Sequence, residues 1–146
     1  MADVHLVVGV AVLVLNLVAG VWGGIAWLTE RPSVSFWYLL RAAQISVILQ
    51  VLLGVLLLIA GHEAEDPLHY MYGSAPLLVN LFAEGMRVGA AQREIPEGVA
   101  FDTLPAGEQR SIALRIVRRE TLVMSLAALL IVAFAERAAQ VSGHLF

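Results

Sequence analysis

The 146-residue sequence contains no cysteine and no lysine. Without cysteine it cannot form disulfide bonds, thiolate metal sites, iron–sulfur clusters or thiol redox relays. Charged residues are also scarce, at 14% of the chain, against about a quarter in an ordinary soluble domain. The net charge of −3 gives no indication of a nucleic-acid partner. Hydrophobic residues make up 60% of the chain and stand in long runs, which predicts an all-α integral membrane protein in contact with the lipid bilayer.

Four apolar runs are candidates for membrane spans, since a spanning helix needs about 20 residues. The last of them is short unless the charged residues at its ends reach the membrane surface. The runs cover about residues 4–28, 42–61, 68–86 and 120–140. No basic segment precedes the first run, so we expect it to be retained as a helix. The sequence therefore predicts one domain, residues 1–146, that folds as an antiparallel four-helix bundle.

The arginines predict the orientation of this bundle. Eight of the nine lie on one side, between spans one and two or between spans three and four, and only Arg137 lies on the other. Positive residues favour the cytoplasmic side, so both termini are expected outside and residues 88–117 form a cytoplasmic loop. Prolines and glycines argue against one long helix in this loop. Residues 111–119 are amphipathic and are expected to lie on the inner leaflet before span four. The expected location is a bacterial or archaeal plasma membrane.

Polar residues inside the spans are costly and are the first candidates for function. At the inner end, Glu84 is expected at the level of Arg41, either as an ion pair that locks spans two and three or as a protonatable group in a proton or ion path. Near the middle, Asn16, Gln50 and Asn80 lie at one depth. We expect them to join helices by hydrogen bonds, with a substrate site as the alternative. A short acidic loop with Asp66 as helix cap and Pro67 in the first turn joins spans two and three.

The outer end collects all four histidines, His5, His62, His69 and His144. Histidine is the commonest metal ligand and also ligates haem iron. His69 with His62 is therefore a candidate metal pair, and His69 with His5 or His144 is a candidate haem site. The alternative is that these are interfacial histidines beside hydrated loops. No spacing among them forms a metal-binding motif.

Residues 44–80 carry a pattern in which Gln50-Val-Leu-Leu-Gly54 is followed by a short outer loop and then by Leu68-His69. This pattern resembles a hairpin of the haem A synthase family, in which a helix with Gln-x-x-x-Gly precedes a helix that opens with Leu-His. The resemblance implies one four-helix half of such a protein, with His69 as an axial haem ligand. The family's second ligand lies within another helix, and here no histidine lies inside span one or span four, so His5 or His144 would have to replace it.

Three functions remain open at this point. The first is a small membrane redox protein that binds haem b near the outer face and exchanges electrons with quinone or a respiratory chain, near Tyr70 and Tyr72. The second is a non-catalytic accessory subunit or assembly factor that binds other membrane subunits. The third is a homo-oligomeric transporter or channel in which Glu84, Asn80 and Asn16 line the path. Whether the protein is an enzyme is not predicted.

Overall fold

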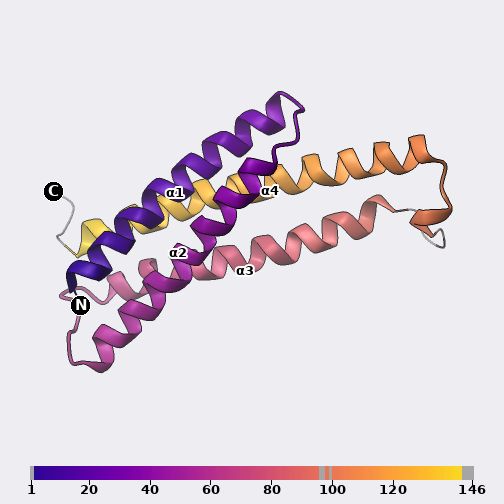
Figure 1. Cartoon of the computed structure of the whole chain (residues 1–146). Helices are drawn as coiled ribbons and strands as arrows, with labels where there is room; N and C mark the ends of the chain where they lie inside the picture. The colour runs from indigo at the N-terminus through magenta and orange to yellow at the C-terminus, as the bar shows by residue number, and fades with distance from the viewer. Residues whose placement is uncertain (1, 96–97, 99, 143–146) are drawn as a thin grey trace.

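The computed structural model describes residues 2–95, 98 and 100–142. It contains four long helices: α1 (Ala2–Leu28), α2 (Val34–Ile59), α3 (Leu68–Glu94) and α4 (Ala106–Val141). A short 3-10 helix, η1 (Phe101–Thr103), lies between the last two, and the described residues include no strand. The prediction of an all-α protein is confirmed. The start of α1, the α2–α3 connection and the end of α4 lie at one end of the molecule (Figure 1), which we call the histidine end because His5, His62 and His69 lie there.

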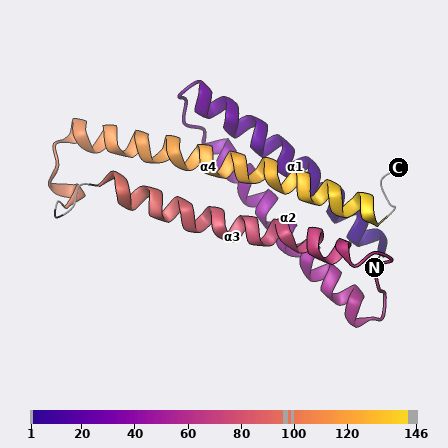
Figure 2. The same ribbon diagram turned by 180° about the vertical axis from the view of Figure 1, so that it is seen from behind.

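Helix α4 is central to the packing. It contacts both α1 and α3 along much of its length, while α1 also packs against α2. Helices α2 and α3 touch far less, because α2 crosses α3 and then diverges from it toward the histidine end, as Figures 1 and 2 both show. At this end α2 therefore lies away from α3 but stays in contact with α1.

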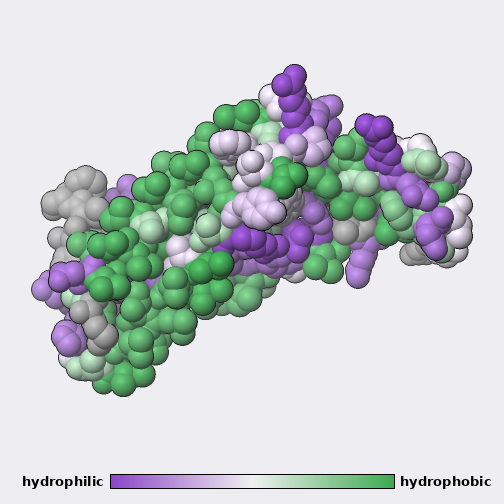
Figure 3. Space-filling view, viewed as in Figure 1, coloured by the Kyte–Doolittle hydropathy of each residue, from purple (hydrophilic) through white to green (hydrophobic). Residues whose placement is uncertain are grey.

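The surface of these helices is that of a membrane protein. Of the described helices, α1, α2 and α4 are long and apolar enough to cross a membrane. Many of their large apolar side chains face outward, among them Val7 at 67% and Ile25 at 56% exposure, and hydrophobic residues cover a broad surface over α1 and α2 (Figure 3). A surface of this kind needs lipid rather than water around it. The third predicted span lies in α3, whose polar residues, such as Asn80 and Glu84, lower its hydropathy.

Two apolar clusters form the core between the helices. The larger one includes Phe36, Leu40 and Met124, each at most 2% exposed. The smaller one joins Val12 of α1, Val47 of α2 and Ile131 of α4. We call this smaller cluster the valine layer. It lies nearer the histidine end than the larger cluster does, as the residue numbers along the three helices require.

Small residues on α1 allow close helix contact, as its glycine spacing predicts. A Cβ atom added to Gly23 would lie 2.1 Å from the Ser125 hydroxyl oxygen and 2.5 Å from a ring carbon of Phe36. A Cβ atom on Gly20 would lie 2.6 Å from Leu129 of α4. Helix α1 therefore approaches α2 and α4 at distances that only glycine permits at these two positions.

The segment expected to be a loop at 88–117 is largely helical, which corrects the prediction. Helix α3 continues to Glu94, and α4 already begins at Ala106 and runs unbroken for 36 residues. The break that the prolines predicted is real but short. Residues 111–119 do not form a separate surface helix, because after Gly107 the sequence contains only residues that tolerate a helix and has no breaker before the span.

The inner parts of α3 and α4 extend beyond the α1–α2 connection (Figures 1 and 2). We call residues 88–117 the inner extension. Glu94 joins its two helices, since one carboxylate oxygen accepts from Arg115 Nε and the other from Arg119 Nη1, each at 3.1 Å. The hydrogen bond from Arg115 is the main cause that holds the pKa of the Glu94 carboxyl below its ordinary value, with Arg119 adding to it.

The α2–α3 connection ends much as predicted. Helix α3 begins at Leu68, whose backbone N–H donates to Asp66 Oδ1 at 2.8 Å. Pro67 therefore occupies the N-cap position rather than the first turn, and Asp66, predicted as the N-cap, lies one residue before it and accepts from the first helical N–H. Pro76 within α3 has no N–H to donate to the Tyr72 carbonyl.

Candidate functional site

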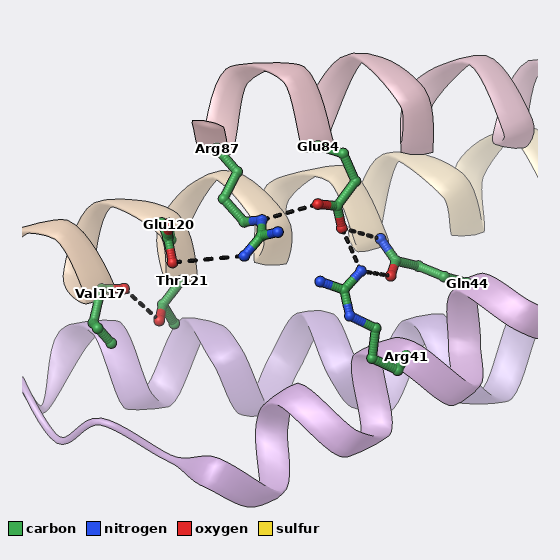
Figure 4. A network of polar contacts seen from close by, with 7 residues as sticks. All are labelled: Arg41, Gln44, Glu84, Arg87, Val117, Glu120 and Thr121. Carbon is green, nitrogen blue, oxygen red and sulfur yellow. Dashed lines mark hydrogen bonds and ion pairs between the residues drawn. The ribbon is translucent and has the colours of Figure 1, made fainter. Parts of the chain in front are cut away.

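The polar groups of the helices include an ionic cluster on the side of the valine layer away from the histidine end (Figure 4). Glu84 of α3 accepts from three donors on its two carboxylate oxygens. Arg41 Nη1 lies 2.5 Å and Gln44 Nε2 lies 2.9 Å from Oε1, while Arg87 Nε lies 2.9 Å from Oε2. Arg87 also reaches Glu120 of α4 at 4.0 Å. The cluster therefore links α2, α3 and α4.

The charges of this cluster balance. Arg41 and Arg87 face Glu84 and Glu120, so two positive groups meet two negative ones. Arg41 is further tied to Gln44, whose Oε1 accepts from Arg41 Nη1 at 2.6 Å. The predicted Arg41–Glu84 ion pair is confirmed. A carboxylate with three donors stays charged at low energetic cost, which favours the structural role of Glu84 over a role as a proton carrier.

Two of the three middle amides, Asn16 and Asn80, do not join the helices as predicted. Asn16, which is 1% exposed, donates from Nδ2 to the Val12 carbonyl of its own helix at 2.8 Å. Its Oδ1 and the Nδ2 of Asn80 are buried and have no partner among the described residues. The prediction failed because an asparagine within a helix can bond a carbonyl one turn back, and this bond competes with an interhelical one.

The third amide, Gln50, has a partner on another helix. Its Nε2 lies 3.1 Å from His5 Nε2, which connects α2 to α1. A Cβ atom on Gly54, one turn further along α2, would lie 3.4 Å from the His5 ring, and one on Gly9 would lie 3.1 Å from Gln50 Nε2. The Gln50-x-x-x-Gly54 pattern therefore forms a face that receives the His5 ring.

His5 and His69 lie together at the histidine end. Their ring centroids are 6.2 Å apart with an interplanar angle of 60°, and the two residues come from α1 and α3. Both side chains are partly buried. The structure thus brings together the predicted ligand His69 and one of its two predicted partners.

The His69 ring is held by a backbone group. Its Nδ1 lies 3.0 Å from the Ala138 carbonyl oxygen of α4, and since a carbonyl only accepts, Nδ1 carries the proton. In the tautomer with its proton on Nδ1, the ring presents the Nε2 lone pair, the arrangement that a metal-ligating histidine adopts. Tyr70 packs edge-on to the His69 ring at 6.2 Å, and its hydroxyl accepts from the Ala64 N–H at 2.8 Å.

The other two histidines do not join this pair. His62 lies in the α2–α3 connection and is exposed, and His144 lies outside the described residues. No group of three or more histidine, aspartate or glutamate side chains in the described ranges could hold a metal ion. The described site is therefore a two-imidazole site, with Gln50 and the Ala138 carbonyl as its supporting groups.

Sequence reasoning placed His69 correctly at the histidine end, but it placed Gln50 at the depth of Asn16 and Asn80, whereas Gln50 lies level with His5 on α1. The signal was present, because Gly9 and Gly54 open space on α1 and α2 around the Gln50 amide and the His5 ring. The Ala138 carbonyl left no signal in the sequence, since every residue has one. Comparison with protein-family models, with curated proteins and with solved structures found no match.

Proposed function

We propose that this chain is a small integral membrane redox protein that binds b-type haem near the outer face, with His5 and His69 as the axial ligands. The observation that carries the proposal is the 6.2 Å separation of the two rings. Two imidazoles that share one metal at about 2.0 Å per nitrogen hold their ring centroids about 6 Å apart. The pair therefore matches this centroid spacing, and the two imidazoles would hold the metal between them.

The donor chemistry fits as well. The Ala138 carbonyl fixes the His69 ring so that Nε2 is the ligating atom. His5 would offer Nε2 as its ligating atom, and the Gln50 amide, which lies 3.1 Å from this nitrogen, would have to turn away from it. The divergence of α2 from α3 toward this end (Figures 1 and 2) offers a direction in which the helices can part to admit a flat apolar ring.

Bound haem would supply one-electron transfer at this end of the membrane. Protein residues would bind and orient it. The His69 ring is held by the Ala138 carbonyl, and the His5 ring lies against α2 at Gly54. Tyr70, beside His69, is the side chain past which a quinone would exchange electrons with such a site.

The proposed protein is an antiparallel four-helix bundle in a bacterial or archaeal plasma membrane, with both termini outside. The arginine bias supports this orientation, and the inner extension would then project into the cytoplasm. Single cysteines introduced at residues 2 and 102 test it. In intact cells a membrane-impermeant maleimide should label residue 2 only, and labelling of residue 102 from outside would reverse the orientation.

Absorbance spectra test the haem site. Wild-type protein expressed with ample haem and purified in detergent should show sharp visible bands on reduction, as six-coordinate bis-histidine iron does. His69→Ala and His5→Ala should each abolish these bands or convert them to a five-coordinate spectrum. His62→Ala is the matched control, because His62 is exposed and lies at the same end of the molecule.

The proposal fails if the wild-type protein is colourless and takes up no haem on titration. It also fails if His62→Ala removes the bands while His5→Ala retains them. In the first case, membrane subunits that co-purify with the protein would support the accessory-subunit function instead.

A further inference from the structure

Two cavities meet at the α1–α2 connection, at the end of the helices opposite to the histidine end. The larger one has a volume of about 820 Å³ and is almost wholly apolar, with a wall formed by α1 residues Leu17, Val21 and Ile25. These residues are about half exposed and face outward. The larger cavity is therefore an open apolar groove along the outward-facing side of α1.

The smaller cavity, of about 220 Å³, lies between the same connection and α4. Three arginines line it, Arg31, Arg115 and Arg118, against one acidic residue, Glu30. The two cavities share Ala26, Arg31 and Pro32. A long apolar cavity thus leads directly into a small cationic one.

The arginines of the smaller cavity differ in how they are paired. Arg118 pairs with Glu30 at 2.9 Å and lies over the Trp27 ring at 5.6 Å. Arg115 pairs with Glu94 of the inner extension at 3.1 Å. Arg31 forms no ion pair with any residue in the described part of the chain. The cavity therefore carries a positive charge that the protein itself leaves unmatched.

We propose that the two cavities together bind one anionic phospholipid, with its headgroup phosphate at Arg31 and an acyl chain along α1. The dimensions agree: Leu17 to Ile25 spans about 12 Å of helix, most of the roughly 15 Å that half a hydrocarbon core measures. Basic pockets between membrane helices bind anionic headgroups in this way. The occupant is a lipid rather than a free anion because the larger cavity opens on the lipid-facing side of α1.

The polar end of the larger cavity is already fixed in place. Ser33 caps α2 by accepting from the Phe36 N–H at 3.2 Å, and Trp22 Nε1 donates to the same hydroxyl at 3.1 Å. Trp22 therefore lines the larger cavity beside Ser33, near the end that also carries Arg31. A ligand that is apolar along most of its length and negative at one end matches this gradient, whereas a neutral quinone would leave the arginines unused.

Lipid titration of the detergent-purified protein tests the proposal. Phosphatidylglycerol should bind saturably and raise the thermal midpoint, and phosphatidylcholine with the same acyl chains should bind more weakly. Arg31→Gln should weaken phosphatidylglycerol binding about fivefold or more. The control is Arg93→Gln, since Arg93 is also exposed and also lacks an ion pair in the described ranges but does not line the cavities. It should bind like wild type.

A second variant tests the apolar cavity separately. Val21→Trp places bulk on its wall, on a lipid-facing side chain that is 49% exposed, so folding should persist, which circular dichroism checks. It should weaken phosphatidylglycerol binding. Equal affinity for both lipids, or an unchanged affinity in Arg31→Gln, overturns the proposal. Inorganic phosphate that raises the midpoint as much as phosphatidylglycerol would also overturn it, in favour of a free-anion site. Haem spectra play no part in these readouts.

Discussion

Replacing Gly23 by alanine tests the closest helix contact in the protein. The added methyl group would meet Ser125 and Phe36, which are 2% and 1% exposed, at 2.1 and 2.5 Å. Neither neighbour can move toward lipid without opening the core, so the contact must be relieved by shifting α1. Overpacking of this kind costs about 1–3 kcal/mol.

The adjacent Gly24 provides the matched control. A Cβ atom there would have no other atom within 4 Å. Both substitutions gain the same helix propensity, about 1 kcal/mol for Gly→Ala in water, and this gain cancels when the two variants are compared. Gly24→Ala should therefore be more stable than Gly23→Ala by the overpacking cost alone, about 1–3 kcal/mol.

Unfolding in mixed micelles provides the measurement. Helix content followed by circular dichroism while the SDS fraction increases gives the free energy of unfolding of each variant. Equal stabilities for the two variants would show that α1 does not approach α2 and α4 as closely as described. A Gly23→Ala variant more stable than Gly24→Ala would refute the packing outright.

Three further predictions concern polar groups. Arg41→Ala should lower the free energy of unfolding by about 1–2 kcal/mol. This loss is smaller than for a fully buried ion pair, because Glu84 keeps two other donors and the Arg41 side chain is 47% exposed. If Arg93→Ala is destabilised to the same extent, the Arg41–Glu84 pair does not contribute to stability. The free energy of unfolding of Asn80→Leu should be within about 1 kcal/mol of the wild-type value or higher, since the buried Asn80 Nδ2 has no partner among the described residues. A larger loss of stability in the same SDS titration would contradict this. Because the pKa of Glu94 is lowered in the folded protein, the stability that its carboxylate contributes is complete above the ordinary glutamate pKa of about 4.3 and is lost as pH falls below it. Limited proteolysis of the inner extension should therefore be faster below that pH than above it in wild type. The Glu94→Gln variant should be cleaved at the same rate above and below that pH.

The sequence predicted most features that depend on depth along a helix, although Gln50 lies level with His5 and not with Asn16. Hydropathy located the apolar runs, and counting residues brought Arg41 level with Glu84 and His69 level with His5. It did not predict contacts that depend on helix rotation. Asn16 faces its own Val12 carbonyl rather than Asn80, and no periodicity distinguishes these outcomes.

The inner extension shows a second limit of sequence reasoning. Proline and glycine mark where a helix stops, but hydropathy marks where a membrane stops, and the two boundaries differ here by more than a dozen residues in α4. The loop was predicted because the end of the membrane span was taken to be the end of the helix. Arginines and glutamates paired across α3 and α4 allow the helices to continue into water.

The valine layer has a consequence for the electrical state of the membrane. Val12, Val47 and Ile131 are each at most 2% exposed. They lie between the histidine pair on one side and the asparagines and ionic cluster on the other, as their positions on α1, α2 and α4 require. A core that was polar throughout could hold a file of water and leak protons, dissipating the transmembrane potential. An apolar constriction resists such wetting, so in a membrane the valine layer would keep water, and with it protons, from passing between the polar groups of the histidine end and those of the ionic cluster.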